Sequence, residues 1–216
     1  RLFFLMIIKK YNKPQYWEEA KAFLIENDRV LMKIIAETDD NKYLQRTCTG
    51  FETLANAIIG QQISILAANS ITEKIKKNIG KINRGNINSA STAKLKNSGL
   101  SHRKVLYLKD LAKLACNKPN YFSNLNKLDD DHVISELCKL YGIGEWTAQM
   151  YLIFQMLRPN ILPMGDVGFI NSMKKVYNLS QDAEKRIIKI TSNWNPYITV
   201  GVWYIWRVTD PEVVQY

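Results

Sequence analysis

The sequence has few of the residues that cross-link small secreted domains or bind transition metals. Its 216 residues include only three cysteines and two histidines. Cys48, Cys116 and Cys138 form no C-x-x-C pair, which argues against a disulfide framework or a zinc site and fits a reducing compartment. His102 and His132 are isolated as well. We therefore expect no metal site built from side chains, and a cytoplasmic protein that would be nucleoid-associated in a bacterium.

A hydrophobic run long enough for a membrane span is also lacking. The apolar start of the chain, RLFFLMII, is too short to cross a bilayer, and no small-residue cleavage site follows it. Two interpretations of this run stay open. It is either an upstream extension, with Met6 as the natural start, or a buried N-terminal strand. We expect no membrane partner.

Basic residues outnumber acidic residues in this chain. The chain has 30 Lys plus Arg against 20 Asp plus Glu, a net charge of +10 and a pI near 9.4. Such a balance favours a polyanionic partner, usually nucleic acid. The alternative is a proteome that is generally rich in lysine. With 46% apolar residues, the chain can bury a sizeable core in one domain or two joined lobes.

Apolar residues recur at helical spacing along most of the chain, and alternating stretches are few. This pattern predicts an all-α protein. The most apolar helix, expected over 196–208, should lie in the core, whereas residues 80–92 should form a loop. An apolar face is expected along residues 51–80, interrupted at Gly60 and the Gln61–Gln62 pair, and its second part includes Leu66. Candidate N-caps precede three of the expected helices: Ser101, Asp129 or Asp130, and Ser180.

A short glycine-containing turn interrupts the helical pattern within KLYGIGEWTAQMYLIF, residues 139–154. A helix, a tight turn containing Gly142 and Gly144, and a second helix starting near Glu145 or Trp146 make a helix-hairpin-helix. The free N–H groups at the start of the second helix, together with its dipole, form an anion site. A DNA phosphate fits this site without any base-specific contact. The alternative is an ordinary tight turn between helices.

Residues 140–148, LYGIGEWTA, match the hairpin L-P-G-I-G-x-W-T-A, with Tyr141 in place of the proline. Five further stretches match in order: FETLANAIIGQQIS, GLSHRKVLYLKDLA, RPNILPMGDVG, WNPYITVGVWYIWR and DPEVVQY. Together they cover about residues 14–216. The chain resembles the helix-hairpin-helix (HhH-GPD) DNA glycosylase superfamily, and within it the AlkA-like branch of 3-methyladenine DNA glycosylase II.

The resemblance implies one HhH-GPD domain over residues 1–216, built as two helical lobes with a cleft between them. One lobe would span about 51–164, and the other about 10–50 plus 165–216. Family members flip a damaged nucleotide out of the duplex and cleave its N-glycosidic bond. The expected partner is therefore double-stranded DNA containing damaged bases, here alkylated purines, bound by a monomer.

The family's catalytic aspartate matches Asp166 in PMGDVG. Its carboxylate would stabilise the oxocarbenium-like sugar. A plain N-cap of the next helix is the alternative, and both roles are compatible. Family members that also nick the strand carry a lysine where this chain has Trp146, and the nearest amine is Lys139. We therefore expect a monofunctional enzyme that uses water, needs no cofactor and lacks the iron–sulfur cluster of some relatives.

The family's base pocket is aromatic, which suits cationic alkylated purines. Trp146 and Tyr197 occupy pocket positions, and Met150 replaces an aromatic residue for which Tyr151 is a neighbouring substitute. Ile198 stands where many relatives have arginine. Core packing is the alternative for each aromatic residue, and it is the preferred interpretation for three others: Trp194, Trp203 and Trp206.

The resemblance also assigns DNA contacts. Gln62, or its neighbour Gln61, would be the wedge that fills the gap left by the flipped base, with a solvated helix bend as the alternative. Phosphate contacts are expected from six residues: Gly142, Gly144, Glu145, Thr147, Arg103 and Lys104. In the family, hairpin carbonyls also bind a monovalent cation, Na or K, that compensates outward-facing carbonyls. Here they would belong to Cys138, Leu140 and Ile143.

Three alternatives to this function stay open. The first is a glycosylase for another lesion. The second is a bifunctional glycosylase/lyase, which would form a Schiff base that borohydride traps. The third is a non-catalytic DNA-binding hairpin module, in which only phosphate contacts matter.

Overall fold

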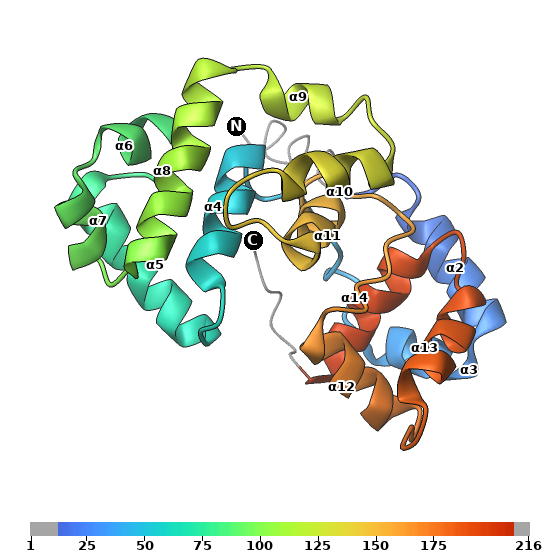
Figure 1. Cartoon of the computed structure of the whole chain (residues 1–216). Helices are drawn as coiled ribbons and strands as arrows, with labels where there is room; N and C mark the ends of the chain where they lie inside the picture. Colours follow the sequence, from blue (N-terminus) through green and yellow to red (C-terminus); the bar gives the residue numbers. More distant parts are fainter. Residues whose placement is uncertain (1–12, 210–216) are drawn as a thin grey trace, which may run out of the picture. The chain divides into compact units, whose positions relative to one another are not determined.

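The computed structural model describes residues 13–209 (Figure 1). The RLFFLMII run and the DPEVVQY tail lie outside these residues, as do the two interpretations of the N-terminus. All the regular elements within 13–209 are helices, α2 to α14, and no strand occurs there. The all-α prediction is confirmed. None of the helices in this range is both long and apolar enough to cross a bilayer.

The chain divides into two compact units. The central unit is Cys48–Tyr151, and the outer unit combines the segments on either side, described over 13–47 and 152–209. The second boundary precedes the predicted position near 164 because residues 158–161 bond to the start of α14. Thr199 Oγ1 donates to the Arg158 carbonyl at 2.7 Å and accepts from Ile161 N at 2.9 Å. Thr199 N donates to the Pro159 carbonyl at 2.9 Å.

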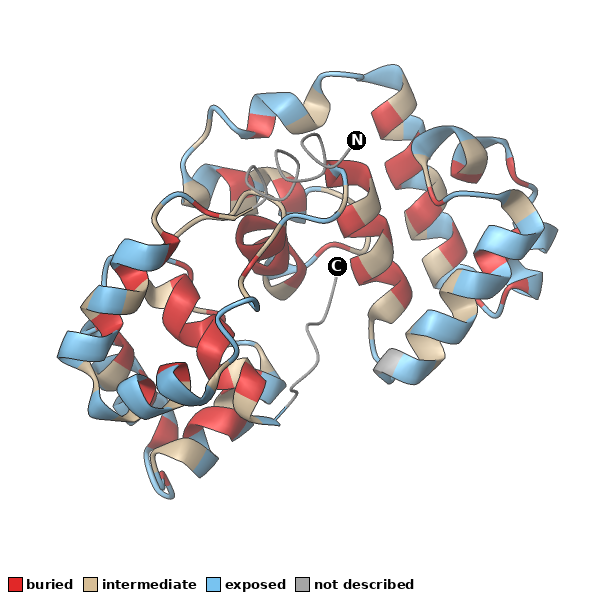
Figure 2. Cartoon of the chain, turned by 180° about the vertical axis from the view of Figure 1, so that it is seen from behind, coloured by how far each residue is buried: buried red, intermediate tan, exposed pale blue. Residues whose placement is uncertain are grey.

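The central unit is built around α4, which packs against α5 and α8. Thr49 and Glu52 form a capping box at the start of α4. Figure 2 shows that buried residues cover most of this helix. The helices of this unit are α4 (Gly50–Gly60), α5 (Ile65–Ile79), α6 (Arg84–Ser89), α7 (Thr92–Asn97), α8 (His102–Asn117), α9 (Tyr121–Leu125), α10 (Asp130–Cys138) and the first seven residues of α11 (Glu145–Phe154).

Two expectations for this unit are wrong. The stretch 80–92 is not only a loop, because α6 forms within it. The side chain of Asn83 accepts from Asn86 N at 2.8 Å and caps this short helix, while Ile87 is fully buried. Leu66 does not join an apolar face but is 82% exposed in the first turn of α5. The predicted caps Ser101 and Asp129 are confirmed.

The outer unit packs around α14, which contacts the other helices of the unit. Trp203 and Trp194 are fully buried, as expected for core residues. Gly201 lets α14 approach Trp194, since a Cβ there would lie 2.5 Å from the indole. The helix over 183–192 begins after Asp182 rather than after the predicted cap Ser180. The helices are α2 (Trp17–Asn27), α3 (Arg29–Glu37), α12 (Val167–Val176), α13 (Ala183–Ser192) and α14 (Ile198–Thr209), with the end of α11.

Asp28 separates α2 from α3 and links them to the rest of the outer unit. Its Oδ1 accepts from Val30 N at 2.8 Å and from Leu31 N at 3.0 Å, which caps α3. Its Oδ2 accepts from the Tyr177 hydroxyl at 2.8 Å and from Trp194 Nε1 at 2.9 Å. Burial, together with this carboxylate, raises the pKa of Tyr177. One carboxylate thus connects three separate parts of the chain.

We expect Asp28→Ala to lower the free energy of unfolding by about 3 kcal/mol, because it removes a helix cap and leaves the buried Trp194 and the half-buried Tyr177 without their acceptor. Urea unfolding followed by circular dichroism measures this. Glu26→Ala is the matched control, since it removes the same charge from an exposed position of α2. An equal decrease in the free energy of unfolding in the two variants would contradict the central role of Asp28.

Candidate functional site

The helix-hairpin-helix forms as predicted, between the end of α10 at Cys138 and the start of α11 at Glu145. Ile143 N donates to the Leu140 carbonyl at 3.1 Å and closes the turn. The first intrahelical bond of α11 runs from Ala148 N to the Gly144 carbonyl at 3.0 Å. The amides of residues 145–147 therefore precede the first intrahelical donor, as an anion site at a helix N-terminus requires.

The two hairpin glycines have different requirements. Gly142 has a left-handed φ of 82°, and a Cβ there would lie 2.2 Å from the Tyr107 ring. Only glycine meets both conditions. A Cβ on Gly144 would have no atom within 4 Å, so the fold of the described residues does not demand glycine there. Gly144 instead leaves the backbone open to the approach of another molecule.

Gln61 and Gln62 lie in the turn between α4 and α5 but differ in their contacts. Gln61 Nε2 donates to the Gly142 carbonyl at 2.9 Å and so supports the hairpin. This contact argues against the predicted wedge role for Gln61. Gln62 is exposed, with a left-handed φ of 58°. Its predicted wedge role stays a prediction that this exposure permits.

Lys104 has a structural use that the sequence did not predict. Its Nζ donates to the carbonyls of Ile59 and Gln61 at 2.7 Å each, at the end of α4. Burial lowers the pKa of this amine. These contacts argue against the predicted phosphate contact of Lys104, because its amine already binds the unpaired carbonyls at the C-terminal end of α4. Arg103 is exposed in the first turn of α8. Thr147, by contrast, is only 3% exposed, which argues against a phosphate contact from its side chain and leaves its backbone amide for this role.

Aromatic and apolar side chains of α11 pack into the protein. Met150 and Tyr151 are each 1% exposed. A Cβ on Gly50 would lie 2.6 Å from the Tyr151 hydroxyl, and the Phe122 ring lies 6.4 Å from the Tyr151 ring. This burial favours core packing over the predicted pocket roles of Met150 and Tyr151. Trp146 is half-buried, and its pocket role stays a prediction.

Tyr197 belongs to an aromatic cluster in the outer unit. Its ring stacks on Tyr16 at 6.1 Å between centroids and meets the edge of Phe23 at 5.6 Å. The Tyr197 hydroxyl donates to Glu19 Oε1 at 2.6 Å, and this hydrogen bond raises the pKa of Tyr197. Tyr16 in turn donates to the Leu157 carbonyl at 2.6 Å. These contacts orient the Tyr197 ring.

Asp166 caps α12, as the alternative interpretation of this residue predicts. Its Oδ1 accepts from Phe169 N at 2.6 Å. The same oxygen accepts from Trp206 Nε1 at 3.1 Å. Core packing is the preferred interpretation of Trp206 from its apolar segment, but the indole is only half-buried and its N–H binds this carboxylate. A signal was present, since a partly buried indole N–H usually finds an acceptor.

The predicted hairpin cation would have to be held by backbone oxygens. No group of three or more His, Cys, Asp or Glu side chains within 13–209 is placed to bind a metal. Cys138 is the last residue of α10, where carbonyls lack helical partners. The Leu140 carbonyl accepts from Ile143 N and has a second lone pair. The residues therefore fit a carbonyl-bound monovalent ion, which stays a prediction.

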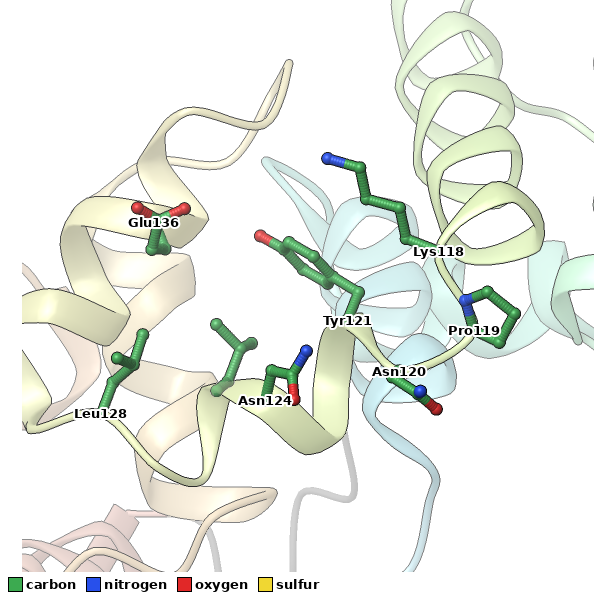
Figure 3. A pocket seen from close by; sticks show the side chains of 8 residues that line it. Lys118, Pro119, Asn120, Tyr121, Asn124, Leu128 and Glu136 are labelled. Carbon is green, nitrogen blue, oxygen red and sulfur yellow. The ribbon is translucent and has the colours of Figure 1, made fainter.

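The central unit also contains a pocket of 510 Å³ between the end of α8, α9 and α10 (Figure 3). It is lined by Lys118, Pro119, Asn120, Tyr121, Asn124, Leu125, Leu128 and Glu136. The Tyr121 hydroxyl is buried without a hydrogen-bond partner among the described residues, and burial raises its pKa. None of the predicted site residues lines this pocket.

Because the two hairpin glycines have different environments, we expect their substitution by alanine to affect stability differently. Gly142→Ala should lower the free energy of unfolding by about 3 kcal/mol through the left-handed φ and the overlap with Tyr107. Gly144→Ala should change it by less than about 0.5 kcal/mol, because the new methyl group meets open space. Urea unfolding of both variants measures the difference, and equal destabilisation would contradict the described turn geometry.

Several known proteins resemble this chain in sequence and in fold. The chain is 27% identical over 192 residues to DNA-3-methyladenine glycosylase 1 of Schizosaccharomyces pombe, a match that covers 86% of this chain and 83% of the relative. Its fold resembles the crystal structure of a DNA-3-methyladenine glycosidase from Bacillus halodurans, with a TM-score of 0.75 and 28% identity over 89% of each chain.

A second solved structure is similar, the 3-methyladenine DNA glycosylase of S. pombe in complex with abasic DNA. It has a TM-score of 0.76 and 25% identity, over 92% of this chain and 98% of that one. The family model of the HhH-GPD base excision DNA repair proteins matches residues 55–196. This range includes both the hairpin and Asp166. The chain belongs to the HhH-GPD superfamily of base excision DNA repair proteins.

Proposed function

We propose that this protein is a monofunctional DNA glycosylase that removes alkylated purines of the 3-methyladenine type from double-stranded DNA. The observation that carries the proposal is the carboxylate of Asp166, held by Phe169 N and Trp206 Nε1 at the start of α12. Support for the substrate class comes from the similar proteins, which are named as 3-methyladenine glycosylases. Membership of the base excision repair family supports the reaction type.

In the proposed mechanism, the amides at the start of α11 and the exposed Arg103 hold the DNA backbone, while the exposed Gln62 fills the gap in the duplex. Trp146 and Tyr197 are the aromatic residues that we assign to the flipped base, whose positive charge favours stacking on their rings. A methylated purine leaves as a neutral base, so it requires little help from a general acid.

The bond changes involve the sugar, the base and one water molecule. The N-glycosidic bond breaks and its electron pair leaves with the purine. The positive charge that develops on the sugar is stabilised by the Asp166 carboxylate. A water oxygen then bonds to C1′ and releases a proton, which leaves an abasic site.

Hydrolysis rather than strand cleavage is supported by the residues near the hairpin. Trp146 offers no amine at the position of the family's lyase lysine. The Lys139 amine precedes the turn and pairs with the Glu136 carboxylate of α10. We therefore assign water as the nucleophile.

We expect Asp166→Asn to lower the single-turnover rate of base release from methylated duplex DNA by about 100-fold or more, because the charge that stabilises the sugar is lost. Asparagine keeps an oxygen that caps α12, so thermal unfolding should change little. Free base is measured by chromatography, and strands are examined with and without hot alkali. Strand breaks should appear only after alkali.

Other results of this experiment have clear meanings. Base release that is equal in wild type and variant would remove Asp166 from the mechanism. An adduct trapped by borohydride would replace hydrolysis with the lyase alternative. Tight, salt-sensitive DNA binding without base release from any alkylated or deaminated substrate would favour a binding module.

Arg103→Ala should weaken binding to duplex DNA and reduce the slope of log affinity against log salt concentration by about 1, the value for one lost phosphate contact. Lys113→Ala is the matched control, because it removes the same charge from an exposed position further along α8. Fluorescence anisotropy at several salt concentrations measures both. The same slope for both variants would show that Arg103 contributes only general charge.

A further inference from the structure

Trp206 connects the last helix of the described chain to the candidate catalytic carboxylate. Its Nε1 lies 3.1 Å from Asp166 Oδ1 and donates to it. Phe169 N donates to the same oxygen at 2.6 Å. One donor comes from α14 and the other from α12, so two helices determine where this oxygen lies. A carboxylate held from two directions has less freedom to rotate than one held by a cap alone.

The indole is itself held in place. It stacks on the Phe154 ring at the end of α11, with centroids 5.7 Å apart and an interplanar angle of 16°. Next to Trp206, Ile205 is fully buried and Arg207 is 8% exposed. The indole is therefore fixed by a ring on one face and by neighbours anchored in the core. A fixed donor is what orients an acceptor.

A second polar contact joins α12 to α14. Ser172 Oγ and Thr209 Oγ1 are 2.7 Å apart, and Ser172 Oγ also donates to the Gly168 carbonyl at 2.8 Å. The pairing of these helices therefore does not depend on Trp206 alone. It is possible to remove the indole N–H while another hydrogen bond still links the two helices.

We propose that Trp206 is a positioning residue for glycosidic bond cleavage, which orients the Asp166 carboxylate toward the sugar. This inference rests on the proposed function, because it assigns the chemistry to Asp166. Trp206 acts through Asp166 and is not required to touch the substrate. Trp206 therefore increases the rate of bond cleavage and has little effect on the affinity for DNA.

Trp206→Phe is the variant that tests this role, because phenylalanine keeps a ring against Phe154 and removes the N–H donor. We expect the single-turnover rate of base release to fall about tenfold, the size of one lost hydrogen bond to a charged group. The dissociation constant for duplex DNA that contains an abasic-site analogue should change less than about twofold. Thr209→Val is the control, since it breaks the other contact between α12 and α14 and should leave the rate near that of wild type.

A double-mutant cycle separates positioning from a general structural effect. If Trp206 acts through Asp166, adding Trp206→Phe to Asp166→Asn should not slow the residual reaction further. A full tenfold loss in the Asp166→Asn background would overturn the inference, as would a wild-type rate for Trp206→Phe alone. If Asp166→Asn itself cleaves at the wild-type rate, the proposed role of Asp166 fails, whereas absence of base release by every variant and by wild type would overturn the proposed function instead.

The hydrogen bond also has a readout that needs no substrate. The chain has five tryptophans, and the indole N–H signal of Trp206 in an amide correlation spectrum is the one that Trp206→Phe removes. Asp166→Asn should move this proton signal upfield, because a charged acceptor is replaced by a neutral one. An unchanged signal would overturn the inference even if no tested DNA were cleaved.

Discussion

Four hydrogen bonds to the Asp28 carboxylate tie together segments of the outer unit that are far apart in sequence. The start of α3, the residue after α12 and the turn before α14 all meet on its two oxygens. Tyr177 follows the last residue of α12, and Asp166 precedes the first. The helix that presents the candidate catalytic carboxylate is therefore anchored at its far end by a second carboxylate. Orientation of Asp166 depends on this anchor as well as on the donors that touch it.

The hairpin of the central unit is supported by side chains from other helices. Tyr107 of α8 packs under Gly142, and Gln61 binds the Gly142 carbonyl. Lys104, on the same helix as Tyr107, binds the Gln61 carbonyl. Tyr141, which stands at the proline position of the hairpin pattern, also meets the Tyr107 ring edge-on, with centroids 4.7 Å apart. The turn is therefore held both by other helices and by its own Tyr141 side chain. A rigid turn suits a site that binds a phosphate through backbone amides.

Patterns that lie within one local segment were readable from the sequence. The hairpin between α10 and α11, the Asp129 cap and the position of Asp166 before a helix each follow from neighbouring residues. Contacts between distant segments were not readable. Nothing local indicates that Lys104 reaches the end of α4 or that Trp206 meets Asp166. Helix α6 was missed because its glycine and asparagines have low helix propensity, and the burial of Ile87 outweighs that preference. The assignment of Trp146 and Tyr197 to a flipped base rests only on the resemblance to the family, because it concerns contacts with a bound molecule rather than contacts within the chain.

In the proposed mechanism Asp166 has two roles, because the carboxylate that caps the start of α12 also stabilises the sugar. The first turn of a helix is where fraying begins, and local opening there requires less free energy than global unfolding. When that turn of α12 opens, the carboxylate loses Phe169 N as a donor and keeps only Trp206 Nε1, so its orientation is less fixed. Heating should therefore inactivate the protein at temperatures where most of its helices are still intact. For this chain, the temperature at which activity is lost would report the stability of one helical turn rather than that of the whole fold.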